Sequence, residues 1–366
     1  MLGEFRESFR YDLKELQSAA GFHVYVAGLF SYLGFLGMAR LVLEHAKKLV
    51  DKHKLPDVIS YQHVTSWYNY LAGNWLEALE SRQTVFDSGT SGGLFWDVMG
   101  YTYWHGASRV YQGKFDEAEA FLEKLMDMEQ KYQFRGFTIF ALLTDILVVS
   151  RRVCESQGEI DKFEAEAVER GSKPFELLAV GWRAVSEVLR KDTAAAKRSL
   201  THSEQIRRTQ TFWPAWYAGS TLLAQFMLDL QLLEDAIGSN SRELIPVTAK
   251  AAVKSGRKAV KNSAAFAAYR AENYRWMGVY YWLVGKQRKT LKWFDRSLEE
   301  GRRLGARPDL ARTYMEVGKR LMQPDSRYRE LNGITATEYL DDAEELFRVM
   351  DLRWDLEQLH WVRTGR

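Results

Sequence analysis

The sequence predicts an all-α protein in which helical hairpins stack into one right-handed solenoid. Three observations lead to this fold class. Amphipathic helices recur in pairs, a turn signal returns at a nearly constant spacing, and only 6 prolines interrupt 366 residues. A lone hairpin of this kind cannot cover both of its apolar stripes, so each pair needs similar neighbours on both sides.

The clearest pair lies in the C-terminal third of the chain. One predicted helix spans residues 272–284 and the other 288–303, with Gly285 and Lys286 at the bend. Gly285 can adopt the left-handed backbone that ends a helix at little steric cost. The small Gly278 stands where the two helices must approach closely. Apolar residues recur at three- and four-residue steps, one stripe per helix, at Tyr274, Met277, Tyr281, Leu291, Phe294 and Leu298.

A TPR-like turn signal repeats along the chain, with a small residue at the bend, a bulky residue two positions later and an alanine five positions later. The cleanest copies begin at Gly73 and Gly113. The others are Gly34–Ala39, a degenerate copy at Gly158–Ile160, Lys191–Ala196, Gln231–Ala236, Gly285–Thr290 and Tyr339–Ala343. The alanine position advances by 39 or 40 residues per copy up to Ala236, against 34 in a simple TPR. This spacing predicts about eight hairpins between residues 20 and 349.

Two insertions and two end caps complete the prediction. The first insertion breaks at residues 237–241 and continues as a basic helix that carries Lys250, Lys254, Arg257, Lys258 and Lys261. The second, residues 323–333, contains the turn signals Pro324-Asp325 and Asn332-Gly333. Residues 1–19 are predicted as an N-terminal capping helix and residues 350–366 as a C-terminal one. Because no linker or shift in composition divides residues 1–366, we expect one domain.

Composition limits the classes of function. Lys and Arg total 51 against 48 Asp and Glu, so no global field favours nucleic acid or an anionic membrane. A single cysteine excludes a disulfide framework and a thiolate metal site, which suits the cytoplasm. The apolar windows 24–39 and 136–150 are shorter than the roughly 20 residues of a membrane span, so we interpret both as buried helices.

No catalytic or metal-binding constellation stands out. The seven histidines are scattered, without the i, i+4 spacing of a helical zinc site. We interpret Cys154 as a buried, inert thiol and the lysine-rich helix as a solvated face, in preference to a surface for an acidic partner, phosphate or nucleic acid. The sequence therefore predicts no cofactor, no metal and no catalytic residue.

Aromatic side chains supply the candidate binding site. In a solenoid of this type the first helix of each hairpin lines the concave surface, and aromatic and arginine side chains there provide contact area at low entropy cost. The repeat projects the following residues onto that groove: His63, Trp67, Tyr70, Tyr103, Tyr111, Arg275 and Trp282. Trp213, Trp216 and Tyr217 are candidates to join them. For any single ring core packing is the preferred reading, whereas for the whole set packing and binding are evenly balanced.

Five stretches resemble one class of repeat protein. They are Tyr280–Lys286, Leu304–Pro308, Ala311–Gly318, Tyr339–Ala343 and Trp354–Leu356. They are similar to the C-terminal TPR-type region of large bacterial signalling proteins, in which a STAND/AAA-type ATPase adjoins a nucleotide-cyclase, kinase or DNA-binding output domain. The resemblance implies a sensor or scaffold and transfers no catalytic residue. The sequence departs from those proteins in having no G-x-x-x-x-G-K-[ST] phosphate loop.

The function we expect is that of a non-catalytic binding module in bacterial signal transduction. Its partner would be a protein or peptide, or else a small molecule, with no membrane and no nucleic-acid partner. Two alternatives stay open at this point. The repeats could be a structural or oligomerisation scaffold with an empty groove, or they could carry an enzyme whose residues meet only in space.

Overall fold

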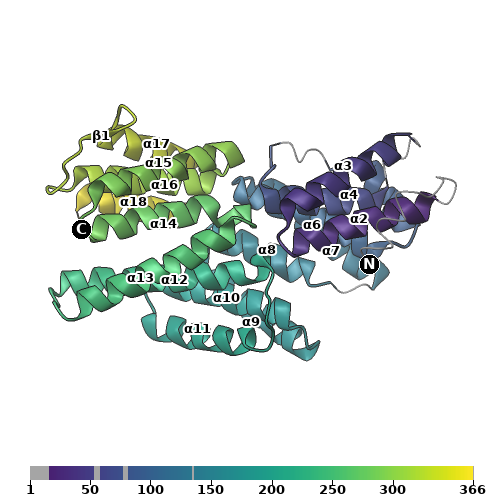
Figure 1. Cartoon of the computed structure of the whole chain (residues 1–366), viewed down its shortest axis with the longest axis horizontal. Helices are drawn as coiled ribbons and strands as arrows, with labels where there is room; N and C mark the ends of the chain where they lie inside the picture. The colour runs from purple at the N-terminus through teal and green to yellow at the C-terminus, as the bar shows by residue number, and fades with distance from the viewer. Residues whose placement is uncertain (1–15, 53–57, 77–80, 134–135, 366) are drawn as a thin grey trace.

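The computed structural model describes residues 16–52, 58–76, 81–133 and 136–365, and these residues are almost entirely helical (Figure 1). The first half of the described chain contains α2 (Leu16–Tyr32), α3 (Leu36–Lys52), α4 (Ile59–Ala72), α5 (Gln83–Ser91), α6 (Phe95–Tyr111), α7 (Phe115–Tyr132), α8 (Thr138–Val149), α9 (Val153–Glu169) and α10 (Lys173–Leu189). The second half contains α11 (Thr193–Arg207), α12 (Ala215–Gly238), α13 (Leu244–Ser263), the 3-10 turn η2 (Ala267–Tyr269), α14 (Arg270–Leu283), α15 (Gln287–Leu304), α16 (Arg307–Met322), α17 (Ala336–Val349) and α18 (Arg353–Thr364).

The helices follow one another as packed pairs. The pairs are α2/α3, α4/α5, α6/α7, α8/α9, α10/α11, α12/α13, α14/α15 and α16/α17, and α18 stands after the last. The first helix of each pair also contacts the first helix of the next, from α2 through to α16. This succession is consistent with the predicted helical solenoid and explains how each pair buries both of its apolar stripes.

The pair that the sequence showed most clearly is confirmed. α14 and α15 lie within two residues of the predicted bounds, and Gly285 ends the first of them with a φ of 71°. Gly278 permits the close approach, because a Cβ at this position would collide with the ring of Phe294, a fully buried residue of α15.

One buried small residue marks the start of the second helix in five pairs. It is the fourth residue of that helix, and it is fully buried in each case, at Ala39, Ala118, Ser156, Ala196 and Thr290. A small side chain here lets the second helix lie close to the first. The predicted spacing therefore has a packing cause.

Three predicted copies of the turn signal are wrong. Gly158 lies inside α9, and the true bend is at residues 150–152, where Arg151 replaces the expected glycine with a φ of 62°. The copy at residues 231–236 lies inside α12, and the copy at residues 339–343 lies inside α17. In all three places helix-forming residues continue through a local match to the signal.

The first predicted insertion is not an insertion in the structure, because its basic helix is the second helix of the pair α12/α13, whereas the second insertion appears where it was expected. Residues of the first extend α12 and form α13, whose five basic residues are all exposed, in agreement with a solvated face. The second forms a hairpin that the all-α prediction did not include. Its strands β1 (Glu330–Leu331) and β2 (Ile334–Thr335) pair around Asn332-Gly333, which both have positive φ.

The ends and the apolar windows follow the prediction in part. Residues 1–15 of the predicted N-terminal cap lie outside the described residues, and residues 16–19 begin α2. α18 corresponds to the predicted C-terminal helix. The window 24–39 is divided between α2 and α3 by a bend at Gly34, and the window 136–150 is α8. Within the described part of the chain, no helix combines the length and the apolar character needed to cross a membrane.

The chain curves back until its C-terminal half contacts its N-terminal half (Figure 1). Three arginines make the junction. Arg303 donates to the carbonyl of Gly73 at 3.3 Å, Arg307 donates to the carbonyls of Gln112 and Gly113 at 2.9 and 2.8 Å, and Arg312 donates to that of Val149 at 2.8 Å. These carbonyls stand at the ends of α4, α6 and α8, where the helix leaves acceptors unpaired and the macrodipole attracts a cation.

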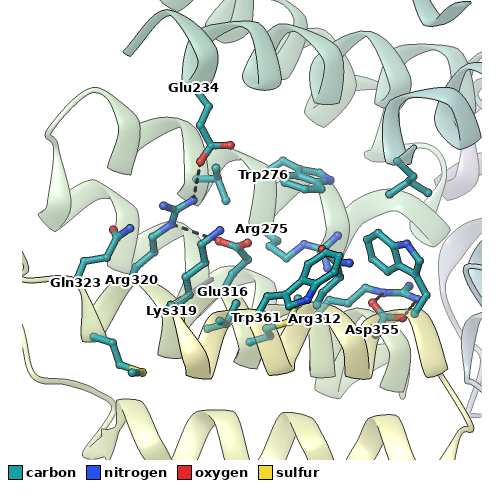
Figure 2. A pocket seen from close by; sticks show the side chains of 18 of the residues that line it. Glu234, Arg275, Trp276, Arg312, Glu316, Lys319, Arg320, Gln323, Asp355 and Trp361 are labelled. Carbon is teal, nitrogen blue, oxygen red and sulfur yellow. Dashed lines mark hydrogen bonds and ion pairs between the residues drawn. The ribbon is translucent and has the colours of Figure 1, made fainter. Parts of the chain in front are cut away.

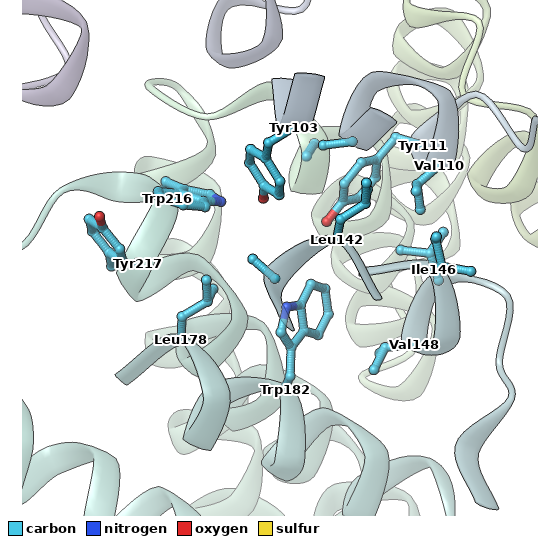
Figure 3. Packing of buried hydrophobic residues seen from close by; sticks show 14 of the residues in the cluster. Tyr103, Val110, Tyr111, Leu142, Ile146, Val148, Leu178, Trp182, Trp216 and Tyr217 are labelled. Atoms are coloured by element: carbon cyan, nitrogen blue, oxygen red, sulfur yellow. The ribbon is translucent and has the colours of Figure 1, made fainter. Parts of the chain in front are cut away.

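Aromatic rings pack with aliphatic side chains in the main core (Figure 3). The ring of Tyr269 lies 6.2 Å from that of Tyr111 and 5.7 Å from that of Trp182, measured between centroids, while Tyr103 lies 5.7 Å from Trp216. One carboxyl group is enclosed among them. Asp145 accepts from the hydroxyl of Tyr103 at 3.1 Å, and burial raises the pKa of Asp145 to about 7.

Candidate binding sites

The projected groove residues of the N-terminal half do not lie on an open surface. Tyr70, Tyr103 and Tyr111 are 0, 1 and 4% exposed and belong to the main core, so their expected position on an exposed trough is wrong. The reason is the curvature of the chain. Phe266 and Tyr269, which come from the C-terminal half, pack against these rings and close the trough that a more open solenoid would leave.

The other four projected residues separate into different environments. His63 and Trp67 line a small aromatic cavity, together with Tyr103 from the core. Arg275 lines a larger pocket that shares no lining residue with this cavity. Trp282 is buried near the end of α14 and lines neither hollow. The structure therefore divides the single predicted groove into two sites.

The larger hollow, which we call the ion pocket, has a volume of about 630 Å³ (Figure 2). Its walls come from the ends of α8 and α10 and from α12, α14, α16 and α18. Most of these are first helices of pairs, which are the helices that the sequence predicted to line the groove. Its charged lining comprises six cationic residues, Arg151, Lys191, Arg275, Arg312, Lys319 and Arg320, and three acidic ones, Glu234, Glu316 and Asp355.

Two arginines at the back of the ion pocket share one carboxylate. Oε1 of Glu272 accepts from Arg151 at 3.0 Å and from Arg275 at 2.8 Å. Burial opposes the ionisation of Glu272, but the two guanidinium groups together hold its pKa below the ordinary value. Burial also lowers the pKa of Arg151 to about 10, which leaves it protonated at neutral pH.

A second buried pair joins α16 to α18. Arg312 meets Asp355 through two parallel hydrogen bonds, from Nε at 2.9 Å and from Nη2 at 2.7 Å, and both side chains are almost fully buried. Asp309 lies one turn before Arg312 on α16. Burial, assisted by the charge of Glu272, raises the pKa of Asp309 to about 6.

The outer wall of the ion pocket has unbalanced charge and apolar surface. Arg320 lies 3.3 Å from Glu316 and 4.0 Å from the half-exposed Glu234. Lys319 and Lys191 have no ion-pair partner among the residues that the structure describes. Trp276, Trp354 and Trp361 complete the wall, and Figure 2 shows Trp276 and Trp361 on opposite sides of the hollow.

Two of the cationic residues that line the ion pocket have a strained backbone conformation. Arg151 and Lys191 have φ values of 62° and 61°, at the bends that follow α8 and α10. Equivalent bends use glycine at Gly73, Gly113 and Gly285, because the left-handed region is costly for other residues. At both bends the residue that stands in place of glycine contributes a positive charge to the lining of the ion pocket. Strain of this type is commonly kept at functional sites.

The smaller hollow, which we call the aromatic cavity, has a volume of about 190 Å³. Rings from α4, α6 and α12 surround it. The indoles of Trp67 and Trp104 are stacked with an interplanar angle of 2° and a centroid separation of 5.7 Å. Trp216 and Tyr217, which the sequence indicated as additional candidates, also line the cavity, whereas Trp213 does not.

One polar group of the aromatic cavity is held in a fixed orientation. Nδ1 of His63 lies 2.8 Å from Oδ1 of Asp97, whose other oxygen accepts from Ser60 at 3.1 Å and from Tyr25 at 3.3 Å. The imidazole lies against Gly100 of α6, where a Cβ would collide with Nε2. A carboxylate can only accept, so Nδ1 carries a proton, and in the neutral imidazole Nε2 is an acceptor.

Little in the sequence predicts the ion pocket. The sequence identified Arg275 but missed Arg151, Arg312 and Asp355, because buried ion pairs between distant helices have no local pattern. Lys191 is the one other lining residue whose position at a bend could be predicted, because it occupies the bend position of the repeat. Cys154 was also misjudged. It is exposed, because the second position of α9 faces away from α8.

No cluster of three metal-ligating side chains occurs within the described ranges of the chain. Comparison of the sequence with known protein families finds no matching family, and comparison with curated proteins finds no similar chain. Function is therefore inferred from the side chains that line the two hollows.

Proposed function

We propose that the protein is a non-catalytic, TPR-like binding module that holds an acidic segment of a partner protein in the ion pocket. One observation carries this proposal. The ion pocket is lined by six cationic side chains and three acidic ones. A surface with this excess attracts carboxylates, and its depth lets a ligand lose part of its hydration.

The excess charge is concentrated where a ligand can reach it. Asp355 is already held by Arg312, and Glu316 by Arg320. Behind the wall, the carboxylates of Glu272 and Asp309 offset the charges of the buried arginines. Among the described residues Lys191 has no such partner. Lys319 forms no ion pair with them either, although the effect of burial on Glu316 is opposed by the charges of Lys319 and Arg320, which together lower the pKa of Glu316. An acidic residue of the ligand would pair with these two lysines.

The three tryptophans indicate that the ligand is also partly apolar. Trp361 is 49% exposed, a large value for an indole. Tryptophan beside cations is a composition typical of protein interfaces. A peptide that alternates acidic and apolar side chains would satisfy both kinds of surface.

A binding event at this position would link several repeats. The ion pocket is lined by α12, α14, α16 and α18, so a bound segment would contact successive pairs and bias the curvature of the solenoid. This is the property that a sensor or scaffold in signal transduction requires. It is also in keeping with the resemblance to the repeat regions of bacterial signalling proteins.

The test is fluorescence anisotropy with three labelled hexapeptides that alternate leucine with glutamate, glutamine or lysine. We expect only the glutamate peptide to bind, with an affinity that falls as salt is added. Lys319→Gln and Lys191→Gln should each weaken binding several-fold. Lys292→Gln, which removes an exposed lysine of α15 outside the pocket, is the matched control.

Equal binding of the three peptides would contradict the proposal, as would equal effects of the pocket and control variants. The oligomerisation scaffold makes a different prediction. It requires a concentration-dependent increase in mass by sedimentation, which the two pocket substitutions should leave unchanged.

A further inference from the structure

The aromatic cavity shares no lining residue with the ion pocket, and its lining contains far fewer ionisable side chains. Apart from His63, none of the described side chains that line it carries a charge at neutral pH. Ionised ligands would lose their hydration there without gaining an opposite charge. The cavity therefore selects for neutral molecules.

Its size and shape limit the ligand further. A volume of 190 Å³ is somewhat larger than the roughly 150 Å³ of an engineered apolar cavity that binds benzene. The parallel indoles of Trp67 and Trp104 line it together with the rings of Trp216 and Tyr217, and Trp104 meets Trp216 edge to face at a centroid separation of 5.0 Å. Flat faces of this kind favour a planar ligand of one or two rings.

His63 supplies the polar contact. It is 5% exposed, it lines the cavity, and Asp97 fixes its proton on Nδ1. In the described part of the chain, no hydrogen bond is made to Nε2. An acceptor on the cavity wall that no described protein group engages is available to a ligand that carries a donor.

We propose that the aromatic cavity is a second binding site, for a neutral planar molecule of one or two rings whose hydroxyl or ring N–H donates to Nε2 of His63. The ligand would contact α4, α6, α8, α10 and α12, which are first helices of successive pairs. Occupation of the site would therefore stabilise the curvature of the N-terminal half.

Three probes of similar size test this by isothermal titration calorimetry of the whole chain. 2-Naphthol has the ring system and a donor, naphthalene has the rings alone, and 2-naphthoate carries a charge. We expect 2-naphthol to bind five- to tenfold more tightly than naphthalene, the value of one hydrogen bond, and 2-naphthoate not to bind.

Two variants separate the contributions. Thr138→Leu adds bulk at the cavity wall and should weaken 2-naphthol and naphthalene alike. His63→Gln keeps a donor for Asp97 but removes the ring acceptor, so the preference for 2-naphthol over naphthalene should disappear while naphthalene binds as before. His360→Gln, at an exposed position of α18, is the control.

Several results would overturn the proposal. They are no binding of 2-naphthol up to its solubility limit, equal binding of 2-naphthoate, unchanged binding to the Thr138→Leu variant, or a preference that persists in the His63→Gln variant. If the His63→Gln variant does not fold, the binding measured for Thr138→Leu and the order of affinity of the three probes still test the proposal. Neither depends on whether an acidic peptide binds the ion pocket.

Discussion

The aromatic cavity and the ion pocket are both lined mainly by first helices of pairs, one in each half of the chain, but by different kinds of side chain. In the N-terminal half, rings cover the inward faces of the first helices, and the cavity that remains between them has a volume of only about 190 Å³. In the C-terminal half, long charged side chains cover the equivalent faces, and a hollow of 630 Å³ remains.

The difference shows how inward residues control the width of the groove. Aromatic rings pack against one another without other partners, so the surfaces that carry them can close together. Charged groups need opposite charges or water, and so helices that carry them keep their distance. The same arrangement of helices therefore yields a closed core at one end and an open pocket at the other.

The largest expected effect tests the dependence of the C-terminal half on buried ion pairs. Arg312→Ala would leave Asp355 charged and buried without a partner, and we expect the free energy of unfolding to fall by about 3–5 kcal/mol. Chemical denaturation at pH 7 measures it. Arg353→Ala, which removes an exposed partner of Asp351, is the control and should change little. Comparable losses in the two variants would show that the buried pair has no special role.

The second prediction concerns the carboxyl group enclosed in the aromatic half. The pKa of Asp145 is about 7 in the folded protein and 3.8 ordinarily, so between these pH values the folded state binds more protons than the unfolded state. This contribution to stability is complete below pH 4 and is lost as the pH rises to 7, by roughly 4 kcal/mol in total.

Asp145→Asn removes this titration but keeps an acceptor for Tyr103. We therefore expect the variant to gain stability relative to the parent as the pH rises from 4 to 7, with no further change above pH 8. Denaturation curves at several pH values provide the measurement. A constant difference between the two proteins would mean that Asp145 ionises normally inside the core.

The third prediction concerns the junction between the halves. Arg307 donates two hydrogen bonds to carbonyl groups at the end of α6, and Arg307→Met keeps the length of the side chain but none of the donors. We expect a loss of about 1–3 kcal/mol in unfolding free energy. Hydrogen exchange at the end of α6 should rise with it. Arg329→Met, at an exposed position after α16, should alter neither quantity.

The smallest expected effect has the opposite sign. Lys191→Gly relieves the left-handed strain at the end of α10 and should stabilise the protein by about 1 kcal/mol, although it removes a cation from the ion pocket. Lys197→Gly, in the interior of α11, should instead destabilise by about 1 kcal/mol. A loss of stability in both variants would contradict the view that Lys191 is kept at a cost for its charge.

The sequence by itself determined the helices and their pairing. The 3.6-residue period, the glycine bends and the buried small residue at the start of the second helix act over a few turns, so Gly278, Gly285 and Ala118 could be read directly. It failed at the bend that contains Arg151 in place of glycine, because the turn signal predicts a bend at the nearby Gly158 instead. It also failed where a local match to the turn signal continued as helix, as in α12 and α17.

Only the tertiary structure decided which inward faces close and which stay open. The curvature is the sum of small rotations between successive pairs, and no local pattern encodes that sum. As a result, Tyr70 and Tyr111 became core, Trp67 became the wall of a cavity, and Arg312 met Asp355 across 43 positions of sequence. Contacts between residues so far apart depend on the whole path of the chain between them.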